Sequence, residues 1–267
     1  MQSGVLVTPG KPVKLAAHPP EATLGYKDKE GAAAAMGAAG ERLAEHATRL
    51  AATARQSVLV VLQGMDASGK DGTVKRCIGV LNPMMVRIAS FKAPTSQELA
   101  HDFLWRITRE LPGRGQIGVF NRSQYEDVLV VRVESLVPEK VWRPRYEAIN
   151  AWERNLAAEG TVIVKMFLHI SKEEQAERFR ERLADPRKKW KFSPEDLAKR
   201  EKWDDYMEAY REMLARTSTK WAPWHVIPGD RKWVRDAVVT EILADTLEGL
   251  GLDYPTLAPE IARLSVA

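Results

Sequence analysis

The chain is poor in cysteine and in long apolar runs. Cys77 is the single cysteine among 267 residues, which excludes an intramolecular disulfide and any cysteine-based zinc cluster. No apolar run approaches the roughly 20 residues that span a bilayer, and the N-terminus lacks the charged-then-apolar pattern of a secretion signal. We therefore expect a cytoplasmic protein without a membrane partner, and we expect the Cys77 thiol to be buried and inert.

An excess of charge of one sign is also lacking. The chain has 40 Lys and Arg residues against 36 Asp and Glu residues, a net charge of +4, which is too mild to indicate a nucleic-acid partner. Its composition is that of an ordinary globular protein, and its length suits one α/β domain with a substantial core.

A glycine-rich segment follows the first apolar strand. The sequence GMDASGKDG at 64–72 fits the G-x-x-x-x-G-K loop, in which backbone N–H groups and a lysine surround a chain of phosphates. Asp71 stands where this motif has Ser or Thr, the usual Mg²⁺ ligand, and Asp66 adds a second carboxylate. This departure indicates a metal arrangement unlike that of an ordinary ATPase. The predicted phosphate-binding residues of the loop are Gly64, Ala67, Ser68, Gly69, Lys70 and Asp71.

Apolar strands alternate with helices from residue 57 onward. Near-continuous apolar strands separated by helical segments predict an α/β fold, a parallel sheet with helices on both faces. The glycine-rich loop then lies at the carboxyl end of the first strand, where ligands bind in such folds. The predicted strands are 57–63, 85–91, 117–121, 161–170 and 224–228, and the predicted helices are 70–81, 95–111, 127–134, 138–159, 171–184, 194–216 and 230–249.

The predicted elements divide the chain into three parts. Prolines and glycines without a period indicate an irregular arm at the N-terminus, and apolar residues at helical spacing predict a long helix over 29–55. We assign 1–56 to this arm and helix, packed on the core. The core is 57–250, including a lid at about 178–195, and 251–267 is a C-terminal tail.

A polar cluster follows the third predicted strand. Phosphoryl transfer needs a carboxylate that holds Mg²⁺ and a cation over the transferring group, and Asp127 and Arg122 are candidates for these roles. Glu126 is a second candidate acid. The alternative is a helix start, because Ser123 followed three residues later by Glu126 is the pattern of a capping box. Both interpretations are compatible.

A dense basic run follows the fourth predicted strand. Nucleotide kinases carry at this position a mobile lid that closes over phosphates. More cations are present than a triphosphate needs, and a longer polyanion would use them; the alternative is a plain solvated surface. The predicted lid residues are Arg178, Arg182, Lys188, Lys189 and Lys191.

Two further segments bear on the predicted site. Lys92 and Arg106 precede the third strand and are placed on the acceptor side. A stripe formed by Lys199, Trp203, Tyr206 and Tyr210 has helical spacing, and we interpret it as core packing. The predicted nucleotide-binding residues are Lys92, Arg106, Asn121, Arg122 and Glu126.

With these motifs in view, the chain resembles the polyphosphate kinase 2 family, and its class III members most closely. The resemblance covers roughly residues 25 to 250. It is carried by GMDASGKDG at 64–72, HDFLWR at 101–106, LPGRG at 111–115, FNRS at 120–123, and KWK at 189–191 with Arg200 and Trp203.

The resemblance implies a fold, a reaction and roles for single residues. The fold is that of a P-loop kinase with a helical lid, similar to thymidylate kinase. The reaction moves the terminal phosphate of inorganic polyphosphate to AMP and ADP, reversibly and with Mg²⁺, or Mn²⁺ in its place; GMP and GDP are further acceptors, and a homo-oligomer, a dimer or tetramer, is expected. The implied catalytic residues are Asp66, Lys70, Arg122 and Asp127, with Asp66 and Asp127 on the metal and Lys188, Lys189 and Lys191 in the polyphosphate channel or lid.

Two other functions remain open from the residues alone. An ATP-dependent nucleotide kinase of the thymidylate-kinase type could use the same scaffold. A non-catalytic protein could grip a polyanion with its basic lid, although Asp66, Glu126 and Asp127 would repel such a ligand unless a metal lay between.

Overall fold

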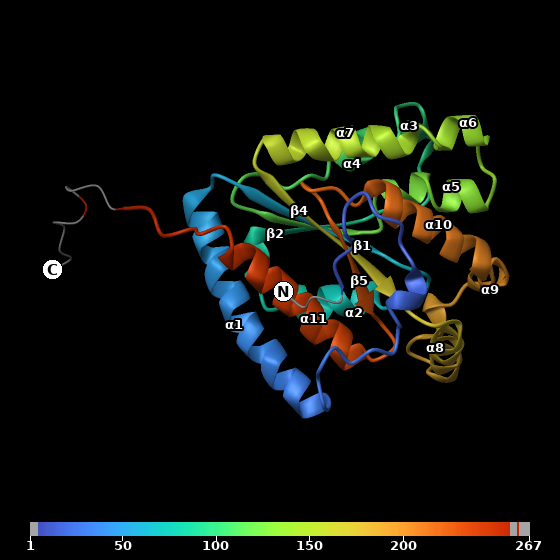
Figure 1. Ribbon diagram of the computed structural model, residues 1–267, viewed down its shortest axis with the longest axis horizontal. Helices are drawn as coiled ribbons and strands as arrows, with labels where there is room; N and C mark the ends of the chain where they lie inside the picture. Colours follow the sequence, from blue (N-terminus) through green and yellow to red (C-terminus); the bar gives the residue numbers. More distant parts are fainter. Residues whose placement is uncertain (1–4, 257–260, 262–267) are drawn as a thin grey trace.

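A five-stranded parallel sheet forms the centre of the molecule. The computed structural model describes residues 5–256 and 261, and Figure 1 shows the strands enclosed by helices. All strand pairs are parallel, in the order β2-β3-β1-β4-β5. The prediction of a parallel sheet flanked by helices is therefore confirmed. The strands are β1 (Ser57–Gln63), β2 (Val86–Ser90), β3 (Ile117–Asn121), β4 (Thr161–His169) and β5 (Trp224–Pro228).

Alternate residues of β1 face two separate apolar layers. Val58, Val60 and Leu62 pack in the layer under α1 (Lys29–Thr53) and α11 (Lys232–Glu248). Leu59 and Val61 pack in the opposite layer, with α7 (Arg145–Ala158) and α10 (Trp203–Thr217), and Figure 1 shows these two pairs of helices on opposite sides of the sheet. Because neighbouring side chains of a strand point to opposite faces, an uninterrupted apolar strand is what a sheet covered on both faces requires.

The N-terminal segment packs against the edge of the sheet. Leu6 forms an antiparallel bridge with His225 of β5, and Val5, Val7 and Val13 are buried. The following helix α1 packs along α11, so its apolar stripe is covered by the same chain. Of the predicted C-terminal tail at 251–267, most lies outside the described residues. Cys77 is fully buried, as expected, and burial raises the pKa of its thiol to about 12.

Several predicted helices are shorter or interrupted. The helix predicted at 95–111 is two single turns, α3 (Ser96–Leu99) and α4 (Trp105–Thr108). Helix 138–159 is broken at Pro144 into α6 (Glu139–Trp142) and α7, because proline has no N–H to continue a helix. The segment predicted as helix 70–81 forms α2 (Lys70–Thr73), which a π-helical turn (Val74–Ile78) continues. In place of helix 127–134, a 3-10 turn (Gln124–Asp127) precedes α5 (Val130–Val133). The segment predicted as helix 194–216 is divided into α9 (Pro194–Glu201) and α10.

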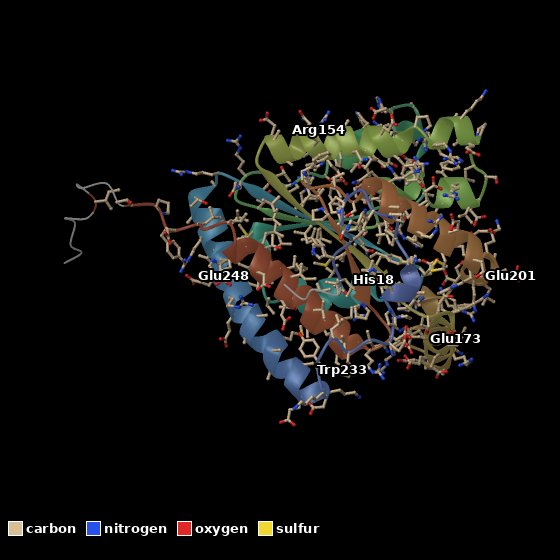
Figure 2. All side chains as sticks on the ribbon, in the orientation of Figure 1. His18, Arg154, Glu173, Glu201, Trp233 and Glu248 are labelled. Atoms are coloured by element: carbon tan, nitrogen blue, oxygen red, sulfur yellow. The ribbon has the colours of Figure 1, made fainter. Side chains whose placement is uncertain are left out.

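The predicted lid region lies at the end of the sheet to which β4 points (Figure 1). Between 178 and 195 it contains the later part of α8 (Lys172–Ala184), a 3-10 turn (Lys189–Lys191) and the first residues of α9. Figure 2 marks this end by Glu173 on α8 and Glu201 on α9, whereas Glu248 of α11 lies on the other side of the view. Within the described residues, no helix combines the length and the apolar character that crossing a bilayer requires.

Candidate active site

The glycine-rich loop joins β1 to α2 with an unusual backbone. Gly64, Ala67 and Gly69 have φ angles of 152°, 65° and 102°, values that favour glycine because a Cβ restricts them. A Cβ on Gly64 would lie 2.7 Å from the carbonyl oxygen of Leu168, so the first position of the motif needs glycine for space as well. Successive N–H groups in such a turn form a concavity that binds anions.

Lys70 folds back into this loop. Its Nζ donates hydrogen bonds to the carbonyl oxygens of Gly64, at 2.7 Å, and Met65, at 3.2 Å. Burial, together with the nearby Arg122 charge, lowers the pKa of Lys70 to about 8. Carbonyl oxygens therefore hold the ammonium group at the loop, and they balance its positive charge only in part.

The back of the loop is held by side chains of α8. Arg178 is buried, and its Nη1 donates to the carbonyl oxygens of Ala67, at 2.8 Å, and Ser68, at 3.0 Å. Gln175 donates to the carbonyl oxygen of Asp66 at 2.9 Å. Arg178 also donates to Gly229 and Glu174, so its contacts are those of a support behind the loop. Direct phosphate binding by Arg178 stays a prediction.

Asp66 brings together two cations from distant segments. Its carboxylate lies 2.6 Å from Nη2 of Arg122, at the end of β3, and 3.4 Å from Nζ of Lys199, on α9. Burial raises the pKa of Asp66, but Arg122, Lys70 and Lys199 outweigh it and hold the pKa below its ordinary value. Asp66 is thus an ionised carboxylate between two cations, one of which lies on α9, just after the predicted lid.

Arg122 is held in a strained backbone position. Its φ angle is 64°, which is uncommon for a residue with a Cβ. Its guanidinium lies between Asp66 and Glu126, the latter at 3.5 Å. The predicted capping box does not form: Ser123 Oγ accepts from the N–H of Tyr125 rather than of Glu126, and the side chain of Glu126 turns toward Arg122. Glu126 therefore belongs to the site more than to the helix start.

Asp127 points to a different partner. Nη1 of Arg145, at the start of α7, donates to Oδ1 of Asp127 at 2.9 Å and to its carbonyl oxygen. Burial raises the pKa of Asp127 to about 6, although Arg145 and Arg106 oppose the shift. The structure thus brings Glu126, rather than Asp127, into the group around Arg122. A shared metal between Asp66 and Asp127 stays a prediction.

The lid touches the loop through a second lysine. Nζ of Lys191 lies 3.2 Å from the carboxylate of Asp71, which also accepts from Nδ2 of Asn121 at 2.9 Å. Other cations of the basic run pair within the lid region: Lys188 with Asp185 at 3.1 Å and Arg182 with Asp196 at 3.8 Å. The side chain of Lys189 is exposed.

The predicted acceptor residues meet beside the sheet. Arg106 is buried, and its Nη1 donates to the carbonyl oxygen of Lys92 at 2.8 Å. Its guanidinium also lies over the ring of Phe91, 5.7 Å from the centroid. The side chain of Lys92 is exposed. Arg106 therefore fixes the segment after β2, and Lys92 extends from that segment.

The space between these groups is narrow. The cavity lined by Asp66, Arg122, Glu126 and Lys199 has a volume of about 20 Å³, enough for about one water molecule and too small for a phosphate group. Tyr206 and Tyr210 form its apolar wall. Because α9 supplies Lys199, a phosphate can enter here only if this helix or its lysine moves.

The donor atoms of the site suit a hard cation. Carboxylate oxygens are available on Asp66, on Glu126 and on Asp71, whose side chain is 69% exposed. Within the described residues no three or more His, Cys, Asp or Glu side chains converge in a metal-binding group. Mg²⁺ often binds through one or two carboxylates together with the phosphates of its substrate, so these residues fit a magnesium ion that arrives with phosphate.

Sequence reasoning missed two residues of the site and read three aromatic residues beside it correctly as core. Trp203, Tyr206 and Tyr210 are buried as predicted. Lys199, at the start of that stripe, contacts Asp66 and does not pack in the core. A lysine within an otherwise aromatic stripe was the sequence signal for this role. Gln175, fully buried behind the loop, gave no signal.

Comparisons with known proteins point in one direction. The family model described as polyphosphate kinase 2 matches residues 26–252. The chain is 51% identical over 234 residues to the AMP/ADP-polyphosphate phosphotransferase of Meiothermus ruber, covering 88% of this chain and 87% of the relative. It is 43% identical over 262 residues to the ADP-polyphosphate phosphotransferase of Rhodopseudomonas palustris, with 94% and 91% covered.

Solved structures agree with this assignment. The crystal structure of polyphosphate kinase 2 from Arthrobacter aurescens TC1 superposes with a TM-score of 0.91 at 44% identity, covering 97% of this chain and 92% of that one. A P-loop kinase fold follows from this likeness together with the loop geometry. The chain belongs to the polyphosphate kinase 2 family.

Proposed function

We propose that this protein transfers the terminal phosphate of inorganic polyphosphate to AMP and ADP, forming ADP and ATP. The single observation that carries the proposal is the meeting of Asp66, Arg122 and Lys199 beside the phosphate loop. The name of the Meiothermus ruber relative, an AMP/ADP-polyphosphate phosphotransferase, supports both acceptors. The relatives' names do not favour the ATP-dependent alternative.

The donor end of the reaction is proposed to lie at the loop. Backbone N–H groups and Lys70 bind the last phosphates of the chain, while the exposed lysines of the lid, Lys188, Lys189 and Lys191, bind the phosphates behind them. Lys191 pairs with Asp71 at the rim of the loop. Once phosphate is present, this lysine can exchange the carboxylate for phosphate oxygens without a large movement.

The acceptor end is proposed to lie on the other side of Arg122. The phosphate oxygen of AMP or ADP is already ionised near neutral pH, so the attack needs no general base. Arg122 stabilises the charge that spreads over the transferring phosphoryl oxygens. Asp66 and Glu126 keep the guanidinium in place, and Lys92, Asn121 and Arg106 are proposed to bound the nucleotide.

The reaction is proposed to require Mg²⁺, which Mn²⁺ could replace. Asp66 is the proposed ligand, with Asp127 as the second acid predicted from sequence and Glu126 as the acid that shares its cavity. When bound with polyphosphate, the metal neutralises phosphate charge in the transfer. Lys199 and Arg122 both pair with the Asp66 carboxylate in the structure.

One assay tests the proposal. Purified protein is mixed with Mg²⁺, long-chain polyphosphate and AMP, without ATP, and the products are separated by chromatography. We expect ADP first and ATP later. Turnover that appears only when ATP is supplied would contradict the proposal and favour an ATP-dependent nucleotide kinase. Parallel reactions with GMP and GDP test these acceptors, and light scattering of the same sample tests the proposed homo-oligomer.

A further inference from the structure

A fully buried ion pair lies among the residues beneath the turn that carries Arg122. Nζ of Lys165, in β4, lies 2.6 Å from Oε2 of Glu153, in α7, and both side chains are 0% exposed. Two charges taken out of water often stabilise a fold no better than apolar residues of the same size. The hydrogen bonds that this pair makes to its neighbours therefore indicate its role better than its effect on stability does.

Glu153 collects donors from the Arg122 turn. Its Oε1 accepts from Oη of Tyr125, at 2.7 Å, and from Nε2 of Gln124, at 3.1 Å. Both donors are fully buried and lie two and three residues after Arg122 in the chain. Because the backbone of Arg122 has a φ of 64°, a conformation that persists only when its surroundings enforce it, these anchors are suited to hold it.

Lys165 ties the same turn to the helix that follows the lid. Its Nζ donates to Oη of Tyr125 at 2.7 Å and to the carbonyl oxygen of Thr217, the last residue of α10, at 2.7 Å. With the bond to Glu153, all three ammonium protons have acceptors. The helix α10 carries Tyr206 and Tyr210, which line the cavity around Arg122.

We propose that Lys165 and Glu153 are positioning residues that fix Arg122 for phosphoryl transfer. Neither side chain lines the cavity of the site. Glu153 acts through Gln124 and Tyr125, and Lys165 acts through Tyr125. This inference rests on the function proposed above, because it assigns Arg122 to the transferring phosphate. It extends that function to a buried network that the reaction itself does not touch.

The network and the phosphate loop have separate supports. The loop carbonyls are held by Arg178, Gln175 and Arg235, none of which bonds to Glu153 or Lys165. Loss of the ion pair should therefore leave polyphosphate binding at the loop intact and reduce the rate of transfer. A displacement of about 1 Å at a catalytic group can reduce turnover about 100-fold.

The test compares a variant of the network with a stability control. The double variant Lys165→Met with Glu153→Gln removes both charges at little change in size, which avoids leaving one charge buried alone. The control is Ile149→Ala: Ile149 is fully buried on α7, one turn before Glu153, and its side chain makes no hydrogen bond. Ile149→Ala should lower the melting temperature, because it leaves a cavity in the core.

We expect kcat of the double variant to fall about 10- to 100-fold, with the Kd for polyphosphate unchanged. Hydrogen exchange should rise at the amides of residues 122–127 in the double variant and not in the control. Wild-type kcat in the double variant, or an equal loss of kcat and equal exchange in Ile149→Ala, would overturn the inference. A wild-type protein inactive with polyphosphate refutes the proposed function instead, and the exchange comparison still decides the positioning role.

Discussion

At the scale of single residues, the charged side chains of the site are paired with one another or with backbone carbonyl oxygens. Asp66 is neutralised by Arg122 and Lys199, and Lys70 rests on the carbonyl oxygens of its own loop. Each contact joins a group that we propose to act in the reaction to a partner within the protein. Substrate binding can therefore exchange one set of ionic contacts for another, which keeps charged groups from being buried without partners.

Loss of the central residues should stop transfer while the fold remains. We expect Lys70→Ala to reduce kcat at least about 100-fold, as removal of one donor at a developing charge does in other enzymes, and Asp66→Asn to have a comparable effect. Circular dichroism and the melting temperature should stay close to wild type. The control is Asp253→Asn, at a side chain that is 91% exposed and pairs with Arg49. Near-wild-type turnover in either site variant would refute the site.

The charge on Lys70 predicts a pH dependence. Its pKa is lowered to about 8, so the ammonium form that binds phosphate is lost as the pH rises through about 8. We expect kcat/KM for polyphosphate to fall above that pH, and kcat to fall only at higher pH, because bound phosphate favours the charged lysine. In Lys70→Arg, whose guanidinium stays charged, the fall should disappear even if the rate is lower. A fall that persists in this variant would assign the titration to another group.

At the scale of elements, one lysine–aspartate pair links the loop to α9, just after the lid, and a second links the start of α2 to the lid itself. Lys199 of α9 contacts Asp66, and Lys191 of the 3-10 turn contacts Asp71. The two carboxylates belong to the loop and to the start of α2. These two ion pairs partly set the position of the lid. Their lysines and aspartates are also charged groups of the proposed phosphate and metal sites.

Removal of a lid cation should weaken the donor more than the acceptor. In Lys191→Ala we expect the half-saturating concentration of polyphosphate to rise more than that of AMP. The slope of log affinity for polyphosphate against log salt should become shallower by about one, since one phosphate contact is lost. Steady-state kinetics at several salt concentrations measure both.

The matched control for the lid is Arg180→Ala. This cation lies on α8, its side chain is 68% exposed, and it pairs with Glu177 on the same helix. It should leave both half-saturating concentrations close to wild type. Equal effects of Lys191→Ala on polyphosphate and AMP would remove the lid from the polyphosphate site.

Local sequence signals predicted which strands and helices occur better than they predicted the residues at which these elements begin and end. Uninterrupted apolar strands placed β1 and β4 because a strand covered on both faces has no polar face. Helix 95–111 was predicted too long because Thr95 and Glu98 form a capping box for a single turn, and the next turn starts only at Trp105. Short turns of this kind depend on tertiary packing, which periodicity does not record.

At the scale of the whole molecule, the sheet explains why part of the site could be predicted. Asp66 and Arg122 follow neighbouring parallel strands, β1 and β3, whose carboxyl ends meet at one edge. Topology alone brings them together. The contacts of Lys199 with Asp66 and of Arg145 with Asp127 depend instead on how helices pack across that edge, and no spacing in the sequence encodes such a distance.

The central claim is that the loop at 64–72 holds the end of a polyphosphate chain beside Arg122. The most direct measurement is the structure of a complex with Mg²⁺, polyphosphate and AMP. We predict polyphosphate oxygens within hydrogen-bond distance of Nζ of Lys70 and of the loop N–H groups, with Arg122 between the polyphosphate end and the phosphate of AMP. A complex in which nucleotide phosphates occupy Lys70, or in which polyphosphate is bound away from the loop, would contradict the account.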